Sequence, residues 1–384
     1  MRLYKRLVYK IAALCAICLA AFTLTQCGVV NKLDFTIQQA EINPASLTLR
    51  TDGLEYLYAS SILENGNHMV FMRDPANGIT YRVSQNGEEI VTAQDRFAVY
   101  KPEIAPTAYQ AIPFNGSFWI NDFFIDESGQ SRFNLIADRQ VIVSDYCDKM
   151  PYITVINAAG SNNISEERII LNYDTNGKSY LIDVTYPPNQ NMIAASSYRY
   201  YPEQNLEQGK RIVFCGGVGD YIYYQQLQMG AGDPHPDVYT FETHGQPTIY
   251  RYKISDGTTE KIADLPVKLM HLNGNSNALL VSEYDYFAPL EASGKIMSVA
   301  DTSKTFTLPG VSSGANIQQS LFLNDTQLIF NTPVTLFFVD FKSKIIKTLD
   351  ISMYNNIHLS NKRVTFTSGI DPITVYQFNP ENVF

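Results

Sequence analysis

Short runs of apolar, aromatic and β-branched residues, separated by turn residues, fill the chain after Cys27. No stretch there carries the 3.6-residue apolar period of a long amphipathic helix. Asx-Gly pairs, which tolerate positive φ and favour hairpin turns, recur between the runs. These pairs are Asp52-Gly53, Asn65-Gly66, Asn77-Gly78, Asn86-Gly87, Asn115-Gly116, Asn176-Gly177, Asp256-Gly257 and Asn273-Gly274. The pattern predicts an all-β protein built from successive hairpins.

One motif returns along the chain: an alternating strand, a polar turn and a second short strand. Its clearest copy runs from Ile249 through Asp256-Gly257 to Ala263. Matching copies begin near Thr80, Arg132, Ser179, Lys295, Leu336 and Ile373. Successive copies mostly start about 37 to 55 residues apart, close to the period of four-stranded propeller blades.

Seven such units predict a β-propeller over residues 34–384, with seven four-stranded blades around a channel. A six-bladed ring or a pair of β-sandwiches is the alternative. The last unit ends near Phe384, so its outer strand needs another source. We expect Asp34–Gln39 or Ser46–Arg50 to supply it and so close the ring.

The piece IYRYKISDGTTEKIADL, residues 249–265, makes the chain resemble the broad group of bacterial envelope propellers with TolB-type or WD40-like units. The resemblance spans the chain after residue 26 and implies the architecture. The Gly-His and Trp-Asp landmarks of WD40 repeats and the Ser-x-Asp-x-Gly-x-Thr-Trp box of sialidases are missing. Trp119 is the single tryptophan, so the tryptophan pattern of quinoprotein propellers is missing too. No specific family activity is implied.

The N-terminus has the layout of an export signal. Basic residues lie between Arg2 and Lys10, and an uninterrupted apolar run follows from Ile11 to Leu24. Fourteen residues span about 21 Å as a helix, which is short of the hydrocarbon core of about 30 Å. We therefore expect residues 1–26 to be a removable signal peptide rather than a membrane-spanning anchor.

Leu24-Thr25-Gln26-Cys27 resembles the lipobox of bacterial lipoproteins. The resemblance implies that Cys27 is the lipid attachment site, carrying palmitate-type acyl chains, and that residues 27–33 are a tether. Gln26 departs from the Gly, Ala or Ser usual before the cysteine. An ordinary signal with an incidental cysteine is the alternative. We expect a membrane-anchored lipoprotein of the bacterial cell envelope, periplasmic or surface-exposed.

Composition narrows the class of protein. Hydrophobic residues make up 45% and charged residues 17%, which excludes both a disordered chain and a multispanning membrane protein. The signal holds four of the 29 basic residues and no acidic ones, which leaves 25 basic against 38 acidic residues afterwards. A net charge of −13 argues against binding nucleic acid, because that requires many cations to neutralise phosphates.

Two cysteines, Cys147 and Cys215, remain in the expected oxidising compartment once the signal and Cys27 are set aside. They allow one disulfide. Two separately buried thiols are the other interpretation, because sequence does not give their distance.

The lengths of the connections between strands indicate which end of the propeller binds. With the strands of a blade named A to D from the channel outward, the readable A–B and C–D turns are tight. The long connections fall in the B–C set (Gln225–Pro247 and Asp285–Gly294) and the D–A set (Ala93–Thr107 and Ala194–Gly209). Loops longer than about 12 residues in compact domains are usually functional or disordered. This end is therefore the candidate binding face.

Candidate binding residues lie in these connections: Tyr198, Tyr200, Tyr201, His235, Asp237, His244, Tyr284 and Asp285. Exposed tyrosines could stack on sugars or contact a protein, although packing between blades competes as an interpretation. The histidines and carboxylates match no defined metal spacing, and Tyr284 and Asp285 also fit the alternation of a half-buried strand. No metal, cofactor or catalytic residue is expected. The glycine-rich Cys215–Gly219 has no following lysine and predicts a tight turn.

These observations favour a binding or scaffolding module for an envelope protein or glycan. The acidic charge favours a cationic or neutral partner. The alternative is an extracytoplasmic hydrolase or lyase that acts on glycans or peptides in the central pocket. Because no catalytic motif is present, the sequence points away from an enzyme. A purely structural envelope protein is a third hypothesis.

Overall fold

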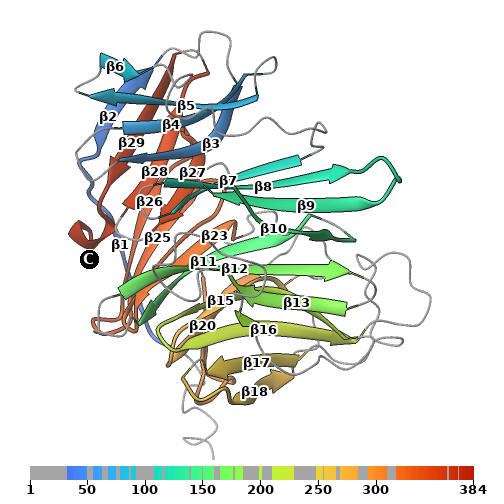
Figure 1. Cartoon of the computed structure of the whole chain (residues 1–384). Helices are drawn as coiled ribbons and strands as arrows, with labels where there is room; N and C mark the ends of the chain where they lie inside the picture. The colour runs from blue at the N-terminus through green and yellow to red at the C-terminus, as the bar shows by residue number, and fades with distance from the viewer. Residues whose placement is uncertain are drawn as a thin grey trace, which may run out of the picture.

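The computed structural model describes residues 33–49, 55–62, 68–74, 78–85, 88–91, 108–114, 117–137, 140–148, 150–159, 165–175, 178–184, 199–200, 210–228, 248–253, 255–264, 269–283, 293–308, 317–360, 363–370 and 372–384. These residues form an all-β propeller of mainly antiparallel sheets (Figure 1). Most strands lie where the alternating and apolar runs predict them, and β14 (Arg199–Tyr200) and the end of β15 (Lys210–Val218) are exceptions. The described part holds no helix long and apolar enough to span a membrane.

Two four-stranded sheets come first along the chain, each with its strands in sequence order. The first contains β3 (Glu55–Ile62), β4 (His68–Asp74), β5 (Gly78–Gln85) and β6 (Glu88–Val91). The second contains β7 (Ala108–Phe114), β8 (Ser117–Ile125), β9 (Ser131–Ala137) and β10 (Gln140–Tyr146).

An eight-stranded sheet follows, in the order β14-β13-β12-β11-β15-β16-β17-β18. Its first half contains β11 (Tyr152–Ala159), β12 (Ser165–Thr175), β13 (Lys178–Asp183) and β14 (Arg199–Tyr200). Its second half contains β15 (Lys210–Val218), β16 (Tyr221–Gln228), β17 (Thr248–Lys253) and β18 (Thr259–Asp264). The halves meet where β11 and β15 run parallel, at the single residue pair Asn157 and Val218.

Three further sheets complete the chain. One contains β19 (Leu269–Gly274), β20 (Ala278–Glu283), β21 (Ser293–Ser298) and β22 (Thr305–Thr307). The next contains β23 (Gln319–Asn324), β24 (Gln327–Asn331), β25 (Thr335–Asp340) and β26 (Ile345–Asp350). The last contains β27 (Asn355–Ser360), β28 (Arg363–Ser368) and β29 (Ile373–Phe378), followed by the short 3-10 helix η2 (Pro380–Asn382).

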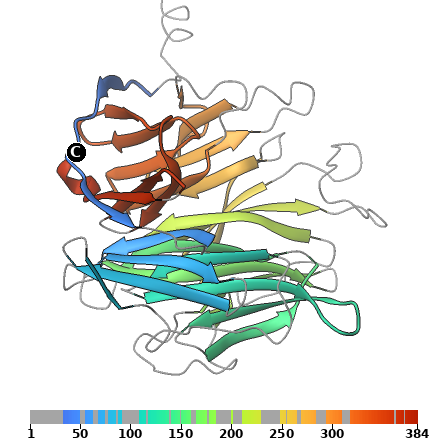
Figure 2. The same cartoon turned by 90° about the horizontal axis from the view of Figure 1, so that it is seen from above.

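Strands from the N-terminal part of the chain complete the two last sheets. β2 (Ala45–Leu49) pairs antiparallel with β29 as the outermost strand. β1 (Thr36–Gln39) pairs parallel with β26. In Figure 2 these blue strands lie beside the red C-terminal ones. The expected closure by N-terminal strands is therefore confirmed, and β3 contacts both β27 and β7 at the join.

The core consists of apolar layers between successive sheets, and β25 shows why. Phe337 belongs to the layer shared with the β19–β22 sheet, whereas Leu336 and Phe338 belong to the layer shared with the β27–β29 sheet. Successive side chains of a strand point to opposite faces, so a strand buried on both faces must be apolar at nearly every position. The ring of Phe337 stacks on that of Phe330 in β24, with centroids 4.5 Å apart. This explains the continuous run Leu336–Val339.

The glycine-rich segment Cys215–Gly219 is not the turn that the sequence predicts. Its residues 215–218 continue β15, and Gly219, at φ +65°, begins the turn. A Cβ on Gly217 would lie 2.0 Å from the carbonyl oxygen of Tyr221, and one on Gly216 would lie 2.6 Å from Oδ1 of Asn273. Glycine is needed here because β15 lies against both its hairpin partner and β19.

Cys147 carries a free, buried thiol, which agrees with the separate-thiol interpretation for this residue. Burial, followed by the nearby carboxylates of Asp148 and Asp145, raises its pKa to about 12. Cys215 lies in β15, among residues whose side chains are not described.

Candidate functional site

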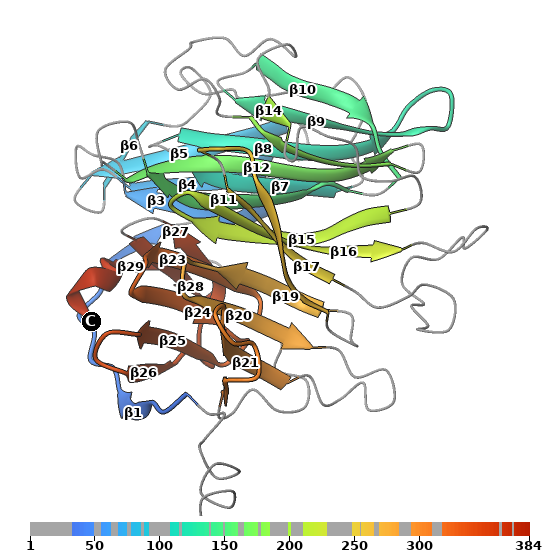
Figure 3. The ribbon, with the colours of Figure 1, turned by 90° about the horizontal axis from the view of Figure 1, so that it is seen from below.

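The propeller has two ends, and the strand order separates them. Within each four-stranded unit, one end carries the turns from the first strand to the second and from the third to the fourth. We call this end the turn end. It carries the turns at Asp220, Asp256, Ser276, Asp301, Asp325 and Lys342. We call the opposite end the connection end. Second strands finish there, as the parallel arrows of β8 and β12 in Figure 1 and of β16 and β20 in Figure 3 illustrate.

Long connections leave the described strands at the connection end. They comprise residues 92–107 after β6, 201–209 after β14, 229–247 after β16 and 284–292 after β20. His235, Asp237 and His244 belong to the third of these, and Tyr284 and Asp285 to the fourth. These five candidate residues lie outside the described residues, as does Cys27. The strands that flank them end at the side that the sequence predicts.

The tyrosine run near residue 200 requires a correction. Arg199 and Tyr200 form the edge strand β14, and Tyr200 pairs with Ile182 of β13. Because β14 runs antiparallel to β13, residues 185–198 connect a third strand to a fourth and start from the turn end. The prediction of a single D–A loop over Ala194–Gly209 is therefore wrong: an edge strand interrupts it. Tyr198 and Tyr201 lie outside the described residues.

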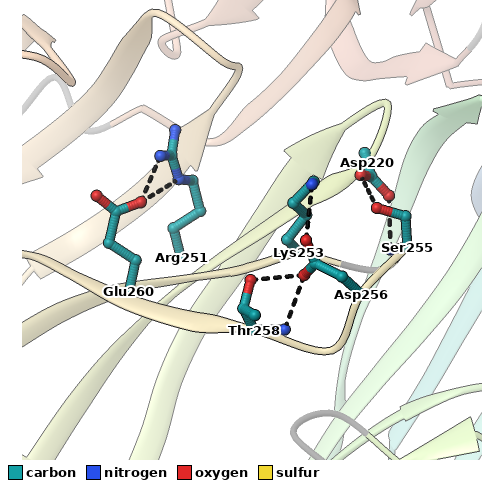
Figure 4. Close-up of polar contacts among 7 residues, drawn as sticks. All are labelled: Asp220, Arg251, Lys253, Ser255, Asp256, Thr258 and Glu260. Carbon is teal, nitrogen blue, oxygen red and sulfur yellow. Dashed lines mark hydrogen bonds and ion pairs between the residues drawn. The ribbon is translucent and has the colours of Figure 1, made fainter.

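Side-chain hydrogen bonds fix the turn end, as the close-up of the β15–β18 region shows (Figure 4). Asp220 accepts hydrogen bonds from the backbone N–H of Ser255 at 2.8 Å and from its hydroxyl at 2.5 Å. Asp256 accepts bonds from Lys253 at 2.7 Å and from the hydroxyl of Thr258 at 2.6 Å. These two partners lower the pKa of Asp256 to about 2. Asp220 joins the turn after β15 to the turn after β17, and Asp256 holds the latter turn in its own conformation.

Arg251 of β17 is the centre of a second network at this end. Its side chain is 17% exposed, and its guanidinium lies 4.5 Å from the ring centre of Tyr221 and pairs with Glu260. It also donates to the hydroxyl of Tyr223, which in turn donates to the carbonyl of Asn275 at 2.6 Å. Burial raises the pKa of Tyr223 to about 12, so this phenol is a hydrogen-bond donor at neutral pH and not a base. The network joins β16, β17 and β18 to the neighbouring sheet.

Polar side chains join β19, β23 and β27, the first strands of three neighbouring sheets. His271 of β19 has Nε2 2.6 Å from the hydroxyl of Ser320 in β23. Asn273 donates to the same hydroxyl at 2.8 Å. Gln319 donates to the carbonyl of Ile357 at 2.8 Å and accepts from the N–H of Leu359. Burial lowers the pKa of His271 to about 4, so the imidazole is neutral. These contacts bind adjacent inner strands to each other.

Two buried carboxylates of the described residues contact neighbouring strands. Asp183 is fully buried and pairs with Arg168 at 2.8 Å, and Asp122 accepts from the backbone N–H of Asn134 at 2.9 Å. Such carboxylates hold strands together. The described part of the chain contains no group of three or more His, Cys, Asp and Glu residues placed to hold a metal ion.

Sequence reasoning missed the networks of Arg251 and His271. Tyr221 and Tyr223 stand out in the sequence as alternating tyrosines, but nothing near them indicates that Arg251 contacts both of them. His271 and Ser320 are 49 residues apart. Strand pairing brings Arg251 to Tyr223, and packing of neighbouring sheets brings His271 to Ser320.

No protein family model and no curated protein sequence matches the chain. Similar solved structures include the Pan2 WD40 domain of Neurospora crassa, which is 9% identical with a TM-score of 0.44 over 89% of this chain and 98% of that one. YCF48 bound to a D1 peptide is 9% identical with a TM-score of 0.44, over 90% and 99%. TolB from Acinetobacter baumannii is 10% identical with a TM-score of 0.34, over 73% and 62%. These likenesses concern propeller architecture, and the assignment of the fold rests on the strand pairing of this chain.

Proposed function

We propose that this protein is a binding module of the bacterial cell envelope, which recognises a protein partner at the connection end of its propeller. The observation that carries the proposal is the placing of four long connections, 92–107, 201–209, 229–247 and 284–292, at one end of the β framework, whereas one connection of comparable length, 185–198, starts from the other end. Loops on a rigid scaffold are where binding residues concentrate.

The contrast between the two ends supports the proposal. At the turn end, carboxylates such as Asp220 and Asp256 are occupied by bonds within and between turns. Few of their acceptor atoms are left for a ligand. The chain's acidic charge, formally −9 with the signal included, favours a partner that is cationic or neutral.

We propose that the framework consists of seven blades. The eight-stranded sheet would count as two blades, β11–β14 and β15–β18. Two observations support this division: their inner strands pair at one position only, and each half is an ordinary four-stranded meander. Three apolar layers adjoin these halves, one of them between the halves themselves.

We propose further that residues 1–26 are a signal peptide, that Cys27 is lipid-modified and that residues 27–33 form the tether of a domain spanning 34–384. The place where the chain enters the fold is consistent with this. The N–H of Leu33 donates to the carbonyl of Thr305, and Phe35 packs on Phe306 and Phe341, all near the turn end. If the lipid anchor joins the fold at the turn end, the connection end faces away from the bilayer.

Site-specific photocrosslinking in the native cell tests the proposed function. A photoreactive phenylalanine would replace Thr240 or Ala288 in the long connections, with Ser303 and Lys342 at the turn end as matched controls. We expect a reproducible protein adduct from the first pair and none from the second. Adducts with glycan instead of protein, or none above background at Thr240 and Ala288, would refute protein binding at this end.

A further inference from the structure

Exposed apolar side chains gather at the connection end. Seven large apolar residues are exposed in the described part of the chain, and five of them lie there: Ile125, Tyr146, Val334, Met353 and Ile370. The other two, Ile37 and Val141, lie on the edge strands β1 and β10. Met353 and Ile370 are each 85% exposed, and Val334 is 46% exposed.

Val334, Met353 and Ile370 each occupy the tip of a tight turn. Val334 lies between β24 and β25, Met353 between β26 and β27, and Ile370 between β28 and β29. Turn tips normally carry Gly, Asn, Asp, Ser or Pro. The described turns of the opposite end follow that rule, with Asp220, Asp256, Ser276, Asp301 and Asp325 near their tips. Apolar tips are thus a property of one end.

Backbone hydrogen bonds hold these turns in place and next to one another. The N–H of Tyr354 donates to the carbonyl of Ile351 at 2.9 Å, which closes the turn that presents Met353. The N–H of Ile351 donates to the carbonyl of Val334, also at 2.9 Å, which joins this turn to the preceding one. Thr332 and Thr335 bond each other across the base of the Val334 turn.

The third turn is connected to the second through β27 and β28. Asn355, two residues after Met353, pairs with Thr367, three residues before Ile370. The hydroxyl of Thr367 donates to the carbonyl of Asn355 at 3.1 Å. Gly369, at φ +77°, leaves room for the carbonyl of Pro372, which would lie 2.5 Å from a Cβ. The backbone of the three turns is therefore held in place before any partner arrives, and such preorganisation reduces the entropy cost of binding.

The charge around these tips is negative. The described residues of the three turns, 332–335, 350–354, 369–370 and 372, contain Asp350 and no Lys, Arg or His. Asp350 is exposed, and the N–H of Ser352, which donates to it at 2.9 Å, lowers its pKa. An anionic lipid surface and a second acidic copy of this chain are disfavoured by such a rim. A cationic protein segment is attracted to it.

Resting on the function proposed above, we infer that Val334, Met353 and Ile370 form a docking surface for a protein segment that carries apolar side chains flanked by Lys or Arg. The apolar tips supply buried area, and Asp350 selects the cationic flanks.

The test begins with a photoreactive phenylalanine at Ser352, beside Met353, in the native cell. The residue cross-linked to it identifies a segment of the partner, which is then synthesised as a labelled peptide. We expect that segment to combine apolar residues with Lys or Arg. An acidic or purely polar segment, a lipid adduct, or a segment of this same chain would overturn the inference.

Fluorescence anisotropy then measures that peptide against the full-length detergent-solubilised protein. We expect the triple variant V334S/M353S/I370S to bind at least about tenfold more weakly than the wild type. The control I37S/V141S, which removes exposed apolar side chains elsewhere, should bind within about twofold. Asp350→Asn should weaken binding and reduce its dependence on salt. The melting curves of all variants should overlap, because the replaced side chains are exposed.

Equal binding by the triple variant and the wild type would overturn the docking surface. The proposed function would still stand if adducts at Thr240 and Ala288 persisted in that variant. If no protein adduct formed at Ser352, Thr240 or Ala288, both proposals would fall.

Discussion

The side-chain hydroxyl of Thr48 lies 2.9 Å from that of Thr374, 326 residues further along the chain. This contact belongs to the pairing of β2 with β29, where Leu47 pairs with Val375 and is 6% exposed. One short N-terminal strand thus completes the last sheet and covers an edge that would otherwise be open to aggregation.

Leu47→Ala should destabilise the protein by about 2–3 kcal/mol, because it removes most of a buried side chain from the closing strand. Urea unfolding monitored by circular dichroism measures the effect. Thr48→Ala, on the exposed face of the same strand, is the control and should change stability by about 0.5 kcal/mol or less. Equal effects of the two substitutions would argue against closure through β2.

Gly217→Ala should destabilise the protein by at least about 1–3 kcal/mol. A Cβ there would lie 2.0 Å from the carbonyl oxygen of Tyr221, so β15 and β16 must separate. Gly219→Ala has open space around its Cβ and suffers only the strain of φ +65°, about 1 kcal/mol. Thermal melting of the two variants compares them. If Gly217→Ala were the milder change, residues 215–218 would not continue β15.

Cys147 should react slowly with thiol reagents in the native protein at pH 8. Burial raises its pKa to about 12, so almost none of it is thiolate at that pH. In urea, without any reductant, the residue should alkylate fully, which peptide mass spectrometry detects. Protection from alkylation in urea that is lost on adding a reductant would instead show a disulfide with Cys215.

Acidification should destabilise the protein from about pH 6.5 downwards. The pKa of His271 is lowered by burial from 6.5 to about 4, so below pH 6.5 the unfolded chain binds a proton that the folded one excludes. The stabilisation is complete above pH 6.5 and is lost progressively as the pH falls to about 4. It amounts to at most about 3 kcal/mol from this residue.

The variant His271→Gln checks the assignment, since its side chain retains a hydrogen-bonding group toward Ser320 but does not titrate in this range. Its free energy of unfolding, measured by urea titration from pH 7.5 to 4, should fall less steeply than that of the wild type. Parallel curves for the two proteins would rule out His271 as the source of the acid sensitivity.

Cys27→Ala should move the protein from the detergent phase to the aqueous phase in a Triton X-114 partition, because acyl chains on Cys27 would be its anchor. Gln26→Gly, which brings the sequence closer to the lipobox pattern, should stay in the detergent phase. Unchanged partitioning of the Cys27 variant would refute lipid anchoring through this residue.

The sequence by itself determined the strands and most turns of this protein. Leu336–Val339 reads as a buried strand because a strand covered on both faces must be apolar throughout, and Asp256-Gly257 reads as a turn because Gly257 adopts φ +72°. The apolar run and the Asp-Gly pair are properties of residues that are close together in the sequence. The need to cover an edge predicted that an N-terminal strand, Asp34–Gln39 or Ser46–Arg50, completes the last sheet, and the structure shows that β2 does so.

The tertiary structure decided everything that depends on distant partners. Gly217 belongs to a strand because Tyr221 lies against it, and Tyr200 is an edge residue because Ile182 pairs with it. The neutral state of His271 follows from burial beside Ser320. The exposed tips at Val334, Met353 and Ile370 are on one end because alternate turns of antiparallel sheets return to that end. Local patterns encode period and turn chemistry, whereas the burial and position of a side chain depend on segments far away in the chain.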